Sequence, residues 1–329
     1  MKPERWASSL ALAVLVVALF AEVLVGTDVV RGRDLLTQFY PRCEAIGASL
    51  AALEAPRWNP WCFHGQPWLG PRAGGALYPA YVLFGWLPPG RAMALFIALH
   101  VLLAAEGARR LMPCGRHAST AAGVAYGLGG FVTAQYWALP YLVTAALLPW
   151  GALGARAVAR GAVERGAALV AATTALALLV GEPQGALALA AVVVATVLVC
   201  VGPRPRPLVL SALAVALGAA AAAPQLVSIL VELPMTDRAQ AGWVDARFDA
   251  APLALALDLL APGALGERAA GARGYWGFAL WSGDLPWCGL TVGALGLAAR
   301  VTSLALPPRD ARALATRRLA VGLVVAGAT

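Results

Sequence analysis

Long apolar runs, each bounded by charged or turn-forming residues, dominate this sequence and limit what it can fold into. About twenty apolar residues in a helix are enough to cross the hydrocarbon core of a bilayer. Hydrophobic residues make up 60% of the 329 positions and charged residues only 13%, which is more apolar than a soluble domain. We therefore predict an all-α, polytopic membrane protein. Its crossing helices are expected at residues 9–26, 91–111, 117–136, 139–155, 167–181, 184–201, 208–230 and 285–299, with a further one starting at 319.

The basic residues indicate on which side of the membrane each loop lies, because short cytoplasmic loops are rich in Lys and Arg. Lys2 and Arg5 precede the first span, and short basic loops recur on the same side if residues 77–87 form a partial helix that does not cross. We therefore predict a multi-pass protein of the bacterial inner (cytoplasmic) membrane with a cytoplasmic N-terminus. Residues 1–329 are expected to form a single transmembrane domain, with a first external loop at 27–78 and a second large one at 231–284.

The net charge of +8 and the isoelectric point of about 9.7 raise the question of nucleic-acid binding. The arginines, however, are spread between apolar spans and do not cluster with exposed aromatic residues. Positive-inside placement accounts for them, so we predict no nucleic-acid partner.

The first external loop is the first large polar segment of the chain and the predicted reaction or binding site. Asp34 and Gln38 are one helical turn apart and are expected on one face of a helix, which Pro41 then interrupts or restarts. The residues after Pro41 have helical spacing that predicts an amphipathic helix lying in the membrane interface. Its expected apolar face consists of Cys43, Ile46, Leu50 and Leu53, and the residues expected to turn elsewhere are Arg42, Glu44, Ser49 and Glu54.

Asp34 is the predicted catalytic residue. Transfer of a sugar from a lipid phosphate needs a base for the acceptor hydroxyl and a positive charge or a metal near the departing phosphate. Neighbouring arginines should keep the Asp34 carboxylate ionised, as a base requires. The alternative is that Asp34 only caps a helix and pairs with Arg31 or Arg33. Guanidinium groups suit phosphate because they donate two hydrogen bonds at once, and the candidate phosphate ligands are Arg31, Arg33, Arg42 and Arg72.

Three further residues are candidate substrate ligands. Gln38 shares the expected face of Asp34. His64 could contact phosphate or metal, although a lone loop histidine is more often solvated. Glu182 stands where a span emerges, so its charge could instead face water beside the helix that Pro183 begins.

The five cysteines have no metal-ligand spacing, and no cofactor is implied with certainty, although a divalent metal is compatible with the chemistry. Cys43 and Cys62 share the first loop and could form a disulfide. Glu106 lies inside an apolar span, where charge is costly and often functional. It is close to the end of that span and could instead pair with Arg109 or Arg110.

A series of short motifs across the chain resembles the bacterial YfhO family of polytopic membrane proteins. The motifs are Asp34-x-x-x-Gln38, Trp58-Asn59-Pro60, Gly65-x-Pro67, Tyr78-Pro79, Gly127-x-Gly129-Gly130, Pro149-Trp150, Gly181-Glu182-Pro183-Gln184 and Pro224-Gln225. This family is similar to the glycosyltransferase C-type superfamily, whose members take a sugar from a polyprenyl-phosphate carrier and act at the outer face. Typical members are longer, and because this sequence stops at Thr329 within an apolar run, we expect it to be an N-terminal portion.

The resemblance implies a glycosyltransferase C-type helical bundle in which Asp34 is the acid of the first external loop that acts as base or orients the acceptor. The family often has His at the position of Glu182, and residues 137–140 carry no acid. The expected function is a membrane glycosyltransferase, with a polyprenyl-phosphate sugar donor, membrane lipids and a cell-envelope acceptor as partners. A non-enzymatic transporter or flippase of lipid-linked substrates is the alternative, and nothing in the sequence defines an oligomeric state.

Overall fold

The computed structural model describes residues 3–26, 28–32, 34–61, 64–70, 75–112 and 115–235, and these residues are mainly helical. Four of their helices are long and apolar enough to cross a membrane. They are α1 (Pro3–Val25), α4 (Pro89–Leu111), α7 (Leu139–Ala159) and α9 (Pro183–Val201). The helical class is confirmed, and these helices are consistent with a multi-pass membrane protein.

The segment predicted as one crossing helix at 117–136 is broken. Helix α5 (Arg116–Gly127) has 12 residues, and the chain continues through α6 (Gly130–Thr133) and the 3-10 helix η3 (Ala134–Trp137). At 1.5 Å per residue α5 is roughly 18 Å long, too short for a hydrocarbon core of about 30 Å. The prediction of a continuous helix was wrong because glycine favours helix ends, and Gly127, Gly129 and Gly130 fall together at the break.

The expected helix at 208–230 is also interrupted. Helix α10 (Pro205–Ala221) is followed by α11 (Ala223–Glu232), with an angle of 78° between α10 and the segment from α11 to η4 (Leu233–Met235). Pro224 explains the break, because proline lacks an N–H group and is tolerated only in the first turn of a helix. If this bent pair is one span, the described residues contain five. The spans expected at 285–299 and from 319, and all but the start of the second external loop, lie outside the described residues.

The first loop contains short elements. The π-helix η1 (Leu35–Phe39) leads directly into α2 (Tyr40–Ala51), so Pro41 restarts the helix. Strand β1 (Trp58–Asn59) pairs antiparallel with β2 (Gln66–Pro67). The partial helix expected at 77–87 is present as the 3-10 helix η2 (Pro79–Val82) and α3 (Leu83–Trp86).

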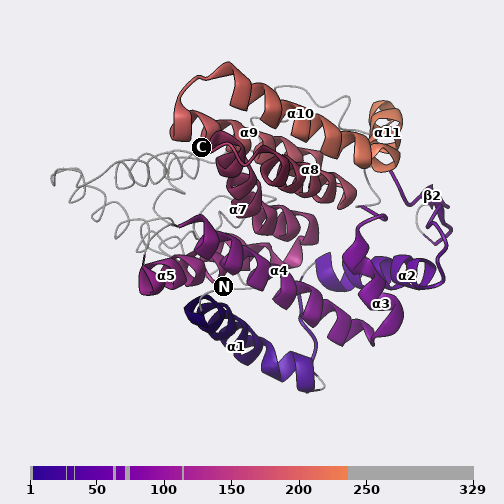
Figure 1. Ribbon diagram of the computed structural model, residues 1–329. Coiled ribbons are helices and arrows are strands. Elements are labelled where there is room, and N and C mark those ends of the chain that lie inside the picture. The colour runs from indigo at the N-terminus through magenta and orange to yellow at the C-terminus, as the bar shows by residue number, and fades with distance from the viewer. Residues whose placement is uncertain are drawn as a thin grey trace, which may run out of the picture.

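The long helices are stacked from α1 at one edge, through α4 and α7, to α10 at the other (Figure 1). α8 (Val163–Leu179) packs closely on α7, since a Cβ atom on Gly154 would lie 2.9 Å from the carbonyl oxygen of Gly166. Elements α2, α3, β2 and α11 gather at one end of the stack, which we call the loop end. We call the opposite end, formed by residues 106–112, 116, 156–165 and 202–206, the basic end.

Candidate functional site

A cavity of about 510 Å³ lies beside the broken helix. Irregular backbone at membrane depth is tolerated where it is buried in protein or lines a cavity, and α6 and η3 meet that condition. The lining is mainly apolar and comes from four parts of the chain. Its residues are Phe20 of α1, Val30 of the first loop, Ile97 and Val101 of α4, and Gly130, Val132, Thr133 and Tyr136 of α6 and η3.

Two contacts hold the first loop at the edge of this cavity. The Tyr40 hydroxyl donates a hydrogen bond of 3.1 Å to the carbonyl oxygen of Val30. Two residues later, a Cβ atom on Gly32 would lie 3.3 Å from a ring carbon of Tyr136 and 3.2 Å from Cβ of Trp137. The chain therefore reaches Asp34 directly from the cavity wall.

Asp34 is half-buried at the N-cap position of η1, but its side chain makes no capping hydrogen bond there. Asp34 therefore does not cap η1 through its side chain, and its pairing with Arg31 or Arg33 stays a prediction. Arg31 and Gln38 are exposed on either side of Asp34 in the chain, and Arg33 lies outside the described residues, as does Arg72.

The turn that follows Asp34 is wider than an α-helical turn. The Tyr40 N–H group donates to the carbonyl oxygen of Leu35, five residues earlier, and Pro41 has no N–H group to continue an α-helical ladder. Single π-helical turns are frequent at functional sites, so η1 is consistent with a functional role for this segment.

Helix α2 has the predicted apolar face in part. Cys43 and Ile46 are fully buried, whereas Leu53 lies beyond the helix end, is 95% exposed and has a φ of 59°. Arg42, which was expected to turn away from the apolar face, is buried because η2 and α3 also cover α2. The sequence pattern predicted one buried face of α2, and it could not predict that the side carrying Arg42 is also buried.

Burial raises the pKa of the Cys43 thiol and of the Tyr81 phenol, and the nearby Arg42 guanidinium opposes both shifts. Cys43 is a free cysteine, and Cys62, its expected disulfide partner, lies outside the described residues. Arg42 lies inside the packed base of the loop and not on its surface.

His64 and Glu182 lie at two other points of the loop end. His64 is exposed in the turn between β1 and β2, with a left-handed φ of 63°. Glu182 is half-buried at the N-cap position of α9 and makes no side-chain capping hydrogen bond. Gly75 lies directly against the backbone of Val180, which leaves no space for a Cβ atom. This contact links the turn that carries Glu182 to the far end of the first loop.

A buried hydrogen bond fixes the same part of the loop to α4. The Tyr78 hydroxyl is 2.6 Å from Nε2 of His100, and Nδ1 of His100 is 2.7 Å from the carbonyl oxygen of Phe96. Because a carbonyl can only accept, Nδ1 carries a proton, and in the neutral ring Nε2 then accepts from the Tyr78 hydroxyl. These two contacts of His100 anchor the loop to α4.

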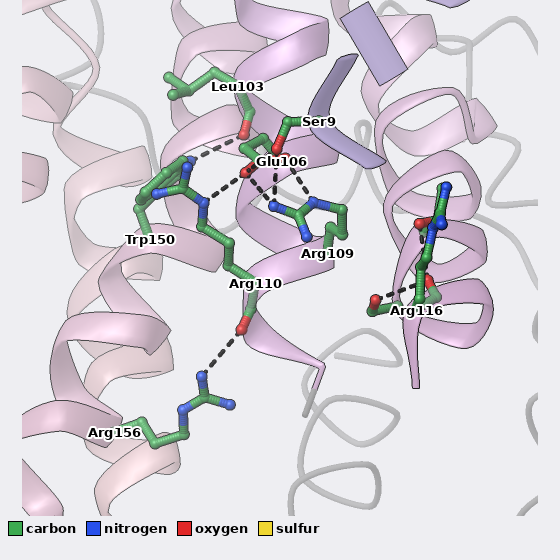
Figure 2. Close-up of polar contacts among 10 residues, drawn as sticks. Ser9, Leu103, Glu106, Arg109, Arg110, Arg116, Trp150 and Arg156 are labelled. Carbon is green, nitrogen blue, oxygen red and sulfur yellow. Dashed lines mark hydrogen bonds and ion pairs between the residues drawn. The ribbon is translucent and has the colours of Figure 1, made fainter. Parts of the chain in front are cut away.

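A second polar cluster lies at the basic end (Figure 2). Glu106 accepts hydrogen bonds from Nε of Arg109 at 2.7 Å, from Nε of Arg110 at 2.6 Å and from the hydroxyl of Ser9 at 3.1 Å. The pairing expected for Glu106 is confirmed, and Ser9 adds a link from α4 to α1. The carboxylate thereby has three partners within the protein.

Thr133 and Tyr136 line the cavity but were not predicted as site residues from the sequence. The signal was present in Gly127, Gly129 and Gly130, which mark the break, but these glycines also suit close packing of an unbroken helix. Among the described residues, no group of three or more His, Cys, Asp or Glu side chains could hold a metal ion. Comparison with known proteins finds no family model, no curated protein and no solved structure that matches this chain.

Proposed function

We propose that this protein is a membrane glycosyltransferase that moves a sugar from a polyprenyl-phosphate carrier to a cell-envelope acceptor at the outer face of the bacterial inner membrane. One observation carries the proposal: the segment leading to Asp34 forms part of the wall of an apolar cavity. A lipid-linked donor has its reacting phosphate at the end of a long apolar chain. A carboxylate beside an apolar cavity suits both parts of such a molecule.

The proposed reaction is a single displacement at the anomeric carbon of the sugar. The acceptor hydroxyl oxygen bonds to that carbon as the bond from the carbon to the phosphate oxygen breaks. The Asp34 carboxylate takes the hydroxyl proton, and the departing polyprenyl phosphate keeps the bonding electron pair. Arg31, which is exposed three residues before Asp34, supplies positive charge to the phosphate.

The other candidate ligands have separate roles in the proposal. Gln38 is exposed within η1 and can hydrogen-bond to hydroxyl groups of the sugar or acceptor. Arg33 and Arg72 remain candidates for the phosphate. Arg42 is buried, so we propose that it contributes positive charge near the site without contacting the substrate. The exposed His64 and the half-buried Glu182 remain candidate contacts to the acceptor.

The cavity lining favours the enzyme over a transporter or flippase. Moving a charged headgroup through the bundle would need polar groups at membrane depth. Phe20, Ile97, Val101 and Val132 instead offer an apolar wall, which suits an isoprenoid chain. Each methylene group that moves from water into an apolar site contributes roughly 0.8 kcal/mol to binding. This value applies only to the part of the isoprenoid chain that would otherwise contact water.

The Asp34→Asn variant tests the assignment of the base. We expect it to lower sugar transfer in membranes at least about 100-fold, the lower limit for loss of a general base. The assay follows radiolabelled sugar from polyprenyl phosphate into the envelope fraction. Asp28→Asn is the matched control, because Asp28 is an exposed carboxylate of the same loop, and it should leave the rate unchanged. Unchanged transfer by a stably inserted Asp34→Asn protein would remove Asp34 from the mechanism.

A cavity variant tests the donor site separately. Val30→Trp adds bulk at the half-buried loop side of the cavity. We expect it to raise the KM for a long-chain polyprenyl donor while changing the KM for a short-chain analogue little. Equal effects on both donors would show that the cavity does not hold the chain.

A further inference from the structure

The basic end holds an arginine stacked on a tryptophan between α4 and α7. The guanidinium carbon of Arg110 is 5.1 Å from the centre of the Trp150 ring, within the range of a cation–π interaction. The indole N–H of Trp150 donates to the carbonyl oxygen of Leu103 at 2.9 Å, which fixes the ring against α4. Nε of Arg110 donates to Glu106, so the plane of the guanidinium is held from two sides.

Arg156 of α7 lies beside Arg110, at the C-terminal end of α4 (Figure 2). Its guanidinium donates to the carbonyl oxygens of Leu111 and Arg110, the second at 3.1 Å, and so satisfies the last turn of α4. Carbonyl groups have no formal charge, so these two bonds do not neutralise the guanidinium of Arg156.

The charges of this face do not balance. In the described part of the chain, the single carboxylate of Glu106 bridges both Arg109 and Arg110. Arg110 remains about half exposed, with 52% of its side-chain surface accessible. The other exposed charged residues described at this end are mostly basic. The basic ones are Arg116, Arg160, Arg165, Arg204 and Arg206, and the acidic one is Glu164.

We propose that Arg110, Trp150 and Arg156 bind the phosphate headgroup of an anionic phospholipid in the leaflet at the basic end. The cations supply charge complementarity, and a tryptophan beside them is typical of the membrane–water interface. Leu111 and Ala152 form a small apolar cluster next to this face, where acyl chains would lie. Partly buried residues of α7 and α9 pack against it, namely Leu153, Val192 and Val199. The proposal is independent of sugar transfer.

The test titrates the detergent-purified chain with a short-chain phosphatidylglycerol and follows thermal unfolding. A ligand that binds only the folded state raises the Tm, and we expect a rise of roughly 5 °C at saturation. Phosphatidylcholine of the same chain length and inorganic phosphate form two further arms. Neither should raise the Tm comparably, because one lacks net charge and the other lacks acyl chains.

Variants locate the site. Arg110→Gln should weaken phosphatidylglycerol binding about tenfold, the effect of losing one charge-assisted hydrogen bond. Arg110→Lys keeps the charge and should bind better than Arg110→Gln. Arg165→Gln, an equal loss of charge at an exposed position of the same end, should bind like the unchanged protein. Each shift is measured against the same variant without lipid, so a less stable variant remains informative.

Three outcomes would overturn the proposal. Equal shifts with phosphatidylcholine would mean that charge is not recognised. Equal shifts with inorganic phosphate would mean that the face binds any anion and no lipid in particular. Equal weakening in Arg110→Gln and Arg165→Gln would mean that the stacked arginine has no special role.

Discussion

At the scale of single residues, Glu106 links two helices through one carboxylate. It accepts from Arg109 and Arg110 on its own helix and from Ser9 on α1, and Arg109 also donates to Ser9 at 3.0 Å. Only 12% of the Glu106 side chain is exposed. Removing the carboxylate would leave the guanidinium of Arg109, whose side chain is only 10% exposed, without its charged partner.

We therefore predict that Glu106→Gln lowers the free energy of unfolding by about 1–3 kcal/mol, between the ranges for surface and fully buried ion pairs. The measurement is thermal unfolding of the purified protein in detergent. Glu164→Gln makes the same chemical change at an exposed glutamate in the first turn of α8 and should have little effect. Equal Tm values for the Glu106 and Glu164 variants would contradict the prediction.

At the scale of elements, a pair of glycines lets α2 lie against α3. A Cβ atom on Gly47 would be 2.6 Å from the carbonyl oxygen of Tyr81 and 2.7 Å from the amide nitrogen of Gly85. These neighbours are backbone atoms and cannot rotate away. The close approach positions α2, and with it Arg42 and Cys43, beneath the candidate site.

Gly47→Ala should therefore separate α2 from α3, at a cost of about 1–3 kcal/mol for overpacking, and make the loop more sensitive to protease. Limited proteolysis and thermal unfolding check the two effects. Gly115→Ala is the control, because a Cβ atom at Gly115 would meet nothing within 4 Å. If both alanine variants behave alike, the contact between the two glycines is not what holds α2.

At the scale of the whole molecule, the hydrogen bonds from Arg156 to the carbonyl groups of Arg110 and Leu111 show that α4 and α7 end at the same side of the bundle. Residue 57 precedes α4 and residue 165 follows α7, so these two positions are expected on opposite sides of the membrane. Between α4 and α7, the short elements α5, α6 and η3 together bring the chain back from the basic end to the loop end.

Labelling of single cysteines tests this arrangement. With the native cysteines replaced, we expect a membrane-impermeant maleimide to react with Arg57→Cys in intact cells. Arg165→Cys should react only after the cells are permeabilised. Labelling of both positions from one side would contradict the arrangement of α4 and α7, whereas the reverse result would keep that arrangement and invert the predicted cytoplasmic N-terminus.

The sequence by itself determined the helical class, the apolar runs that became α1, α4, α7 and α9, which are long enough to cross a membrane, and the amphipathic character of α2 at Cys43 and Ile46. These features depend on hydrophobic length and period, which are local properties of the chain. The pairing of Glu106 with Arg109 and Arg110 could also be predicted from the sequence, because residues three and four apart share a helix face.

Only the tertiary structure decided where helices break and which loop residues are buried. The burial of Arg42 depends on the packing of α2 against η2 and α3, which are distant in sequence, whereas the wide turn of η1 and the break after Gly127 lie at prolines or glycines that the sequence shows. A glycine or proline permits a break but does not require one, because the energy of a break depends on what fills the space beside it. The cavity beside Val30 and Tyr136 exists only when four separate parts of the chain are assembled, and no local pattern of residues encodes it.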